Sequence, residues 1–161
     1  MIAWRCVPFG TLTPAELYEI LRVRAEVFVV EQRCAFQDLD GADQASWHLT
    51  GSRDGKLVAY ARLIPAGIKF AEPSIGRVIT TDAVRGTGMG RTLMRQALAE
   101  AGKLWPGKAL RIGAQQRLER FYASLGFETA SDPYDEDGIQ HVEMLRAAST
   151  IPDRAGEKVG Q

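Results

Sequence analysis

The chain has 161 residues, 45% hydrophobic and 25% charged, which is typical of a single soluble globular domain. Lysine plus arginine and aspartate plus glutamate each total 20, so no net positive charge favours nucleic acid or an anionic membrane as a partner. The two cysteines lack metal-ligand spacing, and we find neither a secretory leader nor an apolar run of membrane-spanning length. We therefore expect a cytoplasmic protein with reduced thiols.

The first third of the chain predicts a strand over residues 3–8 and a helix over residues 14–30. Residues 13–16, Thr-Pro-Ala-Glu, form a capping box with proline at the first helical position. Apolar residues then recur at helical spacing. They are Leu17, Ile20, Leu21, Val27 and Phe28.

The polar segment that follows, residues 31–46, does not have the spacing of a calcium site. Asp38 and Asp40 precede Gly41 as in the start of a calcium loop. That loop needs glycine at its sixth position and glutamate at its twelfth, where this chain has Asp43 and Leu49. We therefore reject calcium and expect no bound metal.

Two strands are predicted over residues 47–52 and 56–64, joined by the hairpin signal Asp54-Gly55.

The rest of the chain is organised around a strand, a glycine-rich loop and a helix that follow this hairpin. Residues 75–81 are rich in β-branched side chains and predict a strand, and a helix is predicted from Gly88 to residue 104 or 105. The glycine-rich loop between them runs from Arg85 to Gly90. A strand, a glycine loop and a helix together point free backbone N–H groups at an anion, so we expect a phosphate or pyrophosphate ligand.

The remaining elements are predicted as a strand over 109–114, a helix over 117–125 and two final strands over 127–131 and 141–145. A turn-rich connector over 132–138 separates the final strands. The order of elements predicts an α+β fold, a mixed sheet with helices on both faces, and the βα repeats imply some parallel pairing. We expect a single domain over residues 1–147 and a disordered tail over 148–161.

Two motifs carry a resemblance to a known family. Arg85, Gly88 and Gly90 form Arg-x-x-Gly-x-Gly, whereas the nucleotide P-loop and the dinucleotide fingerprint are both absent. This pattern resembles the coenzyme A pyrophosphate loop of the GNAT acyltransferase superfamily. Residues 111–127 look like its second motif, with Tyr122 and Gly126-Phe127 at the expected places and Gln115 at the usual asparagine position. Other segments between residues 17 and 146 also resemble the ElaA-type subgroup of this superfamily.

The resemblance implies a splayed pair of parallel strands that hold acyl-CoA between them. Pantetheine would lie along residues 78–80 and the pyrophosphate on residues 85–91. The residues implied in cofactor binding are Val78, Ile79, Thr80, Arg85, Gly86, Thr87, Gly88, Met89, Gly90, Arg91, Gln115 and Tyr122.

The implied reaction is transfer of an acetyl group from acetyl-CoA to an amine. By resemblance, Tyr122 is the candidate acid for the leaving thiolate. A base must also take a proton from the amine. His48 is our candidate and His141 the other histidine, although each is equally explained as a hydrogen-bonded residue at a sheet edge. Cys34 is better explained as a small buried hydrophobe than as a nucleophile.

We expect the acceptor to be a small-molecule or peptide amine. An acidic wall that attracts a cationic amine would be formed by Glu31, Asp38 and Asp40. A carboxylate on the acceptor would be held by Arg62, Lys69 and Arg77. The alternative reading is a non-catalytic acyl-CoA binding or sensor module; an acyl-homoserine lactone synthase, which shares the fold, ranks below both. Exposed sheet edges near the C-terminus would permit a homodimer.

Overall fold

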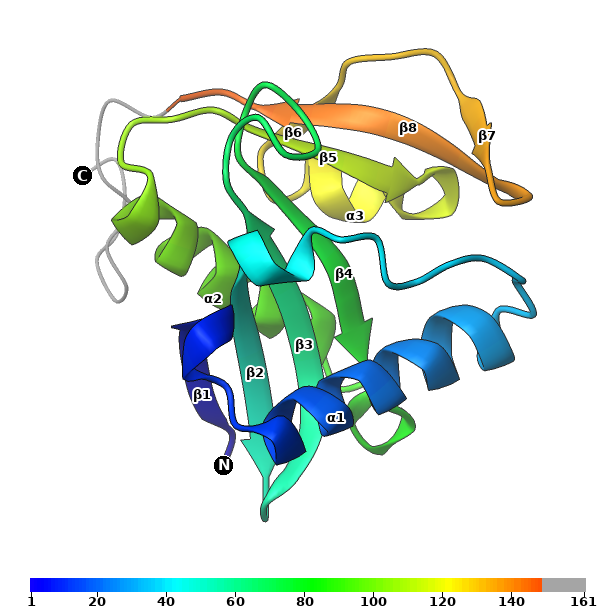
Figure 1. The fold of residues 1–161 in the computed structure, drawn as a ribbon. Coiled ribbons are helices and arrows are strands. Elements are labelled where there is room, and N and C mark those ends of the chain that lie inside the picture. The colour runs from blue at the N-terminus through cyan, green and yellow to red at the C-terminus, as the bar shows by residue number, and fades with distance from the viewer. Residues whose placement is uncertain (149–161) are drawn as a thin grey trace.

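The computed structural model describes residues 1–148, and the predicted tail over 148–161 lies almost wholly outside this range. Figure 1 shows two sheets that meet at an angle, with helices on both faces of the first. The strands are β1 (Ala3–Pro8), β2 (Trp47–Arg53), β3 (Lys56–Ile64), β4 (Ser74–Thr80), β5 (Leu110–Gln115), β6 (Phe127–Thr129), β7 (Tyr134–Glu136) and β8 (Ile139–Arg146). The helices are α1 (Pro14–Arg24), continued by a π-helix over Ala25–Glu31, α2 (Met89–Leu104) and α3 (Glu119–Ala123), with short 3₁₀ turns at Phe9–Thr11, Asp43–Ala45, Asp82–Val84 and Gln116–Leu118.

The first sheet has the order β1-β2-β3-β4 and the second the order β5-β8-β6, with β7 also paired to β8. Every ladder in the described residues is antiparallel. The parallel pairing that the βα repeats predicted is reduced to one backbone bond, from Arg111 N–H to the Pro73 carbonyl at 3.1 Å. From this point β4 and β5 diverge (Figure 1), so the two sheets open as a wedge.

The strand β3 supports a core on each of its faces, because its side chains alternate. Ala59, Ala61 and Leu63 face α2 in the larger cluster of buried residues. Tyr60 faces the other way and packs with Ile20 of α1. The two helices therefore cover opposite faces of the first sheet, as the sequence predicted.

Local sequence signals fixed the ends of several elements. The capping box at α1 is present, with Thr13 accepting from the Glu16 N–H and Glu16 accepting from the Thr13 N–H. Asp54 and Gly55 both have positive φ, 52° and 76°, as a two-residue hairpin between twisted strands requires.

Three expected elements differ from the structure. The single helix predicted over residues 14–30 is α-helical only as far as Arg24 and then widens into a π-helix. The helix predicted over residues 117–125 is one 3₁₀ turn followed by the short α3. The connector over 132–138 also contains β7, which folds onto β8 through a tight turn at Asp137 and Gly138. Turn-forming residues concealed this hairpin in the sequence.

Candidate active site

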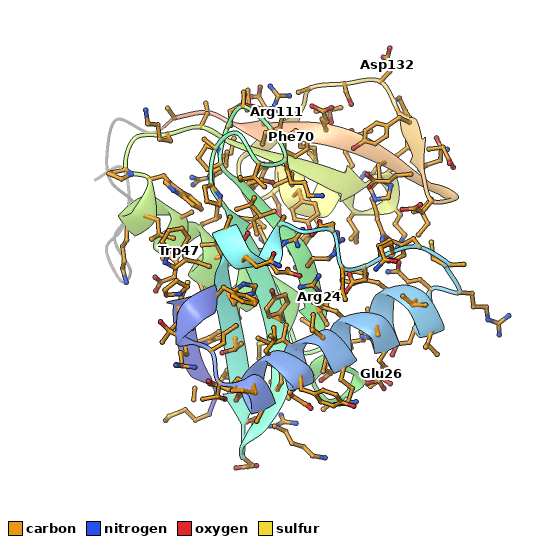
Figure 2. All side chains as sticks on the ribbon, viewed as in Figure 1. Arg24, Glu26, Trp47, Phe70, Arg111 and Asp132 are labelled. Carbon is orange, nitrogen blue, oxygen red and sulfur yellow. The ribbon has the colours of Figure 1, made fainter. Side chains whose placement is uncertain are left out.

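A cavity of about 220 Å³ lies in the wedge between β4 and β5. Residues of both strands line it, together with Tyr122 of α3 and Leu118 of the 3₁₀ turn before α3. The chain after α1, the β3–β4 loop and the β7–β8 hairpin close the cavity further out. Figure 2 shows Phe70 of the β3–β4 loop close to the two strands. The mouth thus collects side chains from segments that are far apart in the sequence.

The wall formed by β4 is irregular at its centre. Tyr60 pairs with Ile79 and Arg62 with Gly76, so two residues of β4, Arg77 and Val78, face one residue of β3. This is a β-bulge, and Arg77 adopts the left-handed conformation with φ of 50°. A bulge interrupts the hydrogen-bond ladder, and Val78 beside it lines the cavity. Polar backbone groups of β4 are therefore free to face the cavity at this point.

The glycine loop leads from the end of β4 into α2. Gly86 and Gly88 have φ of 77° and 82°, a backbone conformation that side-chain-bearing residues rarely adopt, and added Cβ atoms would meet open space. Gly88 caps α2 with no side-chain hydrogen bond, and the first turn of α2 carries no acidic residue. The helix therefore begins with free N–H groups and a positive dipole end.

The two arginines of this loop have protein partners. Arg85 bonds to the Thr80 carbonyl and pairs with Asp82 and Glu31, the latter at 2.8 Å. Arg91 lies over the Phe121 ring, 5.6 Å from its centroid. The cavity itself is not lined by residues 85–91 or by Ile79 and Thr80, so the predicted pyrophosphate loop lies outside it.

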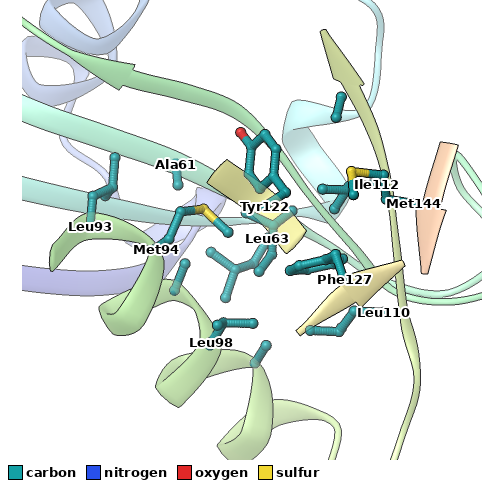
Figure 3. Packing of buried hydrophobic residues seen from close by; sticks show 14 of the residues in the cluster. Ala61, Leu63, Leu93, Met94, Leu98, Leu110, Ile112, Tyr122, Phe127 and Met144 are labelled. Atoms are coloured by element: carbon teal, nitrogen blue, oxygen red, sulfur yellow. The ribbon is translucent and has the colours of Figure 1, made fainter. Parts of the chain in front are cut away.

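Tyr122 stands at the inner end of the cavity. Its ring packs edge-on against Phe127 at 6.1 Å, within the core shown in Figure 3. Burial raises the pKa of Tyr122 to about 12, so the hydroxyl keeps its proton at neutral pH. This hydroxyl makes no hydrogen bond to any other residue in the described part of the chain. It is a proton donor at the wall of a cavity, with no acceptor among residues 1–148.

Gln115, at the end of β5, also lines the cavity. Its side-chain oxygen accepts from Arg117 Nε at 3.0 Å, and its amide nitrogen lies 3.4 Å from the Gln32 side-chain oxygen. The structure thus brings Val78, Gln115 and Tyr122 together around one space.

His48 lies elsewhere, and the expectation that it is the base needs correction. Its side chain is fully buried and does not line the cavity. Nε2 donates to the Asp43 carbonyl at 2.9 Å, which leaves Nδ1 to accept from the Tyr60 hydroxyl at 2.6 Å. Burial lowers the pKa of His48. Both nitrogens are occupied and no substrate can reach them, so His48 is a structural residue.

The predicted acceptor-binding residues form a buried ion-pair network instead. Arg24 bonds to Asp43 at 2.7 Å and to Asp38 at 3.0 Å, and Figure 2 shows Arg24 on the sheet side of α1. Arg62 bonds to both Asp40 and Asp43 at 2.8 Å. Burial by itself raises the pKa of Asp40 and of Asp43, but hydrogen bonds from these arginines hold both below the usual range.

The expected acidic wall is therefore not found. Asp38 also binds Arg77 at 2.8 Å, Glu31 binds Arg85, and neither carboxylate lines the cavity. Arg62 and Arg77 do line it, yet their guanidinium groups are engaged with aspartates. These aspartates neutralise buried arginines, which the sequence alone could not reveal because the partners lie far apart along the chain.

Two acidic residues of the β7–β8 hairpin, Glu136 and Asp137, do line the cavity. His141 of β8 lines it as well. Sequence reasoning treated the first two as part of a connector and ranked His141 second. The aromatic side chains of Phe28, Phe36, Phe70 and Tyr134 complete the mouth. A usable signal was the apolar–polar alternation of Val142, Glu143 and Met144, which is typical of a strand.

No cluster of three or more metal-binding side chains occurs among residues 1–148. Over the same range, no helix combines the length and the apolar character needed to cross a membrane.

Comparison with known proteins gives concordant results. A family model described as the acetyltransferase (GNAT) domain matches residues 16–147. The ElaA protein of Escherichia coli is 40% identical over 148 residues, which cover 91% of this chain and 97% of that protein. A UPF0039 protein of Synechocystis is 43% identical over 145 residues, covering 89% and 94% of the two chains.

Solved structures agree with this assignment. The structure of an acyl-CoA N-acyltransferase from Pseudomonas aeruginosa has a TM-score of 0.88 at 41% identity, covering 91% of this chain and all of the other. The crystal structure of E. coli ElaA has a TM-score of 0.85 at 40% identity, covering 91% and 99%. The fold predicted from the sequence is confirmed.

Proposed function

Because the chain belongs to the GNAT acetyltransferase family, we propose that it transfers an acetyl group from acetyl-CoA to a primary amine of a small molecule or peptide. The amine attacks the thioester directly, with no acyl-enzyme intermediate. The geometry that best supports this activity is the wedge between β4 and β5, which brings the Val78 bulge, Gln115 and Tyr122 around one cavity.

The end of β4 supports binding of the cosubstrate. The N-terminus of α2 follows β4 after a 3₁₀ turn and the glycine loop, and its free N–H groups and dipole suit a pyrophosphate. Arg85 and Arg91 add positive charge at the same place, and Arg85 would exchange its pairing with Glu31 for the phosphates. The pantetheine arm would then run along residues 78–80 into the wedge, toward the Gln115 amide.

The central part of the wedge supports the chemistry. Attack on the thioester places negative charge on its oxygen, and a backbone N–H freed at the Val78 bulge would stabilise that charge. The departing thiolate needs a proton, which the Tyr122 hydroxyl would donate because it is protonated and has no competing acceptor among the described residues. Tyr122 is thus the proposed general acid.

The acceptor would enter from the side lined by the β7–β8 hairpin. There the aromatic side chains Phe70 and Tyr134 provide an apolar surface, and Glu136 and Asp137 attract a cationic amine. This wall takes over the role expected of Glu31 and Asp38.

Calorimetric titration with acetyl-CoA tests the cosubstrate site. Gly88→Glu places a negative charge beside the pyrophosphate and should weaken binding by roughly 100-fold, about 2.8 kcal/mol, because like charges repel there. Gly107→Glu is the matched control, since Gly107 has a similar φ of 70° and open space but lies after the opposite end of α2. Equal affinity of the two variants would remove the loop from the site.

Release of the CoA thiol in the presence of amines, peptides and polyamines tests the transfer itself. We expect turnover by the wild type that depends on both substrates. Binding of acetyl-CoA without turnover across the panel would favour the non-catalytic binding module.

A further inference from the structure

The β7–β8 hairpin brings a histidine to the outer part of the cavity. His141 lines the cavity and is 9% exposed. It is the direct cross-strand partner of Gln115 on β5 and of Tyr134 on β7. Since directly opposed residues of an antiparallel pair project from the same face, His141 stands beside Gln115, where the end of the pantetheine arm is proposed to lie.

Alternation along the strands places this histidine across the wedge from Tyr122. Ala114 and its partner Val142 belong to the buried cluster that contains Tyr122. The next residues, Gln115 and His141, therefore project from the opposite face of the second sheet. A thioester held between β4 and β5 would have the proposed acid on one side and an imidazole on the other.

The contacts of the His141 ring determine which of its two nitrogens can accept a proton. Nδ1 lies 2.8 Å from the Ile139 carbonyl, which can only accept, so Nδ1 carries the hydrogen. In the neutral ring, Nε2 then has a free lone pair. The Tyr134 ring stacks on the imidazole, with centroids 5.9 Å apart, and fixes its orientation.

The neighbour of His141 Nε2 indicates what kind of group this lone pair would bind. Glu136 Oε2 lies 3.4 Å away, and its side chain is more than half exposed. A neutral imidazole and a carboxylate are both acceptors, so this pair lacks a donor. The ammonium group of an acceptor amine carries three N–H donors and would satisfy both atoms at once.

We propose that His141 is the general base of the acetyl transfer, and that Glu136 holds the acceptor ammonium against its Nε2. This inference rests on the proposed function. The other groups around the ring are the phenol of Tyr134, the amide of Gln115 and, at the hairpin turn, Asp137, whose carbonyl accepts from the Cys34 thiol. Glu136 is the nearest charge, and it stabilises the imidazolium that forms.

Protons and bonds balance without any further reactant. An alkyl ammonium has a pKa of about 10.4, so it must lose a proton before it can attack. That proton passes to His141 Nε2 and then to solvent. The free amine forms the N–C bond, the C–S bond breaks, and the second amine proton replaces the one that Tyr122 gives to the thiolate. The products are the acetamide, the CoA thiol and one released proton.

The kinetic test compares His141→Gln with the wild type, with Gln140→Ala as the control because Gln140 is the exposed neighbour on the same strand. We expect kcat/KM of His141→Gln at pH 7 to fall by about 10² to 10⁴-fold, the usual contribution of a general base, with acetyl-CoA affinity unchanged. Because a base must be unprotonated to accept a proton, the wild type should lose activity on acidification, and the variant should lack that loss. An alkoxyamine, which is unprotonated at neutral pH, should show a much smaller deficit.

Wild-type kcat/KM and pH profile in His141→Gln would overturn the proposal, as would a defect confined to acetyl-CoA affinity. Failure of the proposed function has a different signature, because the wild type and Gln140→Ala would then be inactive as well, and the base assignment would fall with it.

A second measurement is independent of turnover. The chain has two histidines, so the imidazole ¹⁵N spectrum contains two rings that His141→Gln assigns. At pH 8 we expect the His141 ring as the neutral Nδ1–H tautomer. A hydrogen on Nε2 at this pH would overturn the proposal, since the lone pair would be absent.

Discussion

At the scale of single residues, burial decides what each polar group can do. The side chains of Tyr60 and Tyr122 are both buried, and burial raises the pKa of each. Tyr60 is committed to His48, whereas Tyr122 has no hydrogen-bond partner among the described residues and faces the cavity. Two tyrosines of similar burial therefore differ in hydrogen bonding, and among the described residues only Tyr60 has its hydroxyl engaged.

Replacing Tyr122 by phenylalanine tests its role. We expect kcat to fall by about 10² to 10⁴-fold, the range for a lost general acid, while acetyl-CoA affinity stays close to the wild-type value because the ring remains packed. Steady-state thiol release and calorimetry measure the two effects. Tyr18→Phe, at an exposed position on α1, is the control, and wild-type turnover in Tyr122→Phe would exclude this residue from the mechanism.

At the scale of elements, the N-terminus of α1 is specified locally and its C-terminus is not. The capping box needs only residues 13–16, so it is readable in the sequence. The change to a π-helix at Ala25 occurs next to Arg24, whose side chain is fully buried against Asp38 and Asp43. Seven residues are too few for an apolar pattern to distinguish π from α periodicity.

The capping box allows a prediction for this element. Thr13→Ala removes the acceptor of the Glu16 N–H and should lower the free energy of unfolding by about 1 kcal/mol, which for a domain of this size is a decrease in Tm of about 2–4 °C. Urea and thermal unfolding followed by circular dichroism measure it. Thr11→Ala, two residues upstream at an exposed position, should leave stability nearly unchanged. If the free energy of unfolding changed equally in the two variants, the Thr13 cap would add nothing specific to stability.

At the scale of the whole molecule, buried polar groups hold the first sheet to the segment before it. His48 on β2 bonds to Asp43, which also binds Arg24 of α1 and Arg62 of β3. Removal of one partner from such a network leaves a buried charge uncompensated, which typically costs about 3–5 kcal/mol. Arg62 is the member of this network that lines the cavity, so the network helps to shape one wall of it.

This arrangement makes global stability depend on pH. Burial lowers the pKa of His48 in the folded state, so below the unfolded value of about 6.5 the unfolded chain binds the extra proton and the folded chain does not. Stability should be fully present above that value and decrease as pH falls, by at most about 1.4 kcal/mol per pH unit, until the folded pKa is reached.

Urea unfolding between pH 5.5 and 8 measures this dependence. His48→Gln should be less stable at pH 8 yet show a flatter profile than the wild type. An unchanged slope in His48→Gln would mean that another group carries the pH dependence.

Sequence alone determined the parts of this protein that depend on neighbours along the chain. The glycine loop, the helix cap, the Asp54-Gly55 hairpin and the family follow from short-range spacing, because turns, caps and backbone conformation are set within a few residues. Tertiary structure decided which polar residues are free. Asp38 meets Arg77 from 39 positions away, and the hairpin after α3 brings His141 to Gln115. His48 is buried and hydrogen-bonded, and Arg62 and Asp38 are held in ion pairs with distant segments. His141, in contrast, faces the cavity.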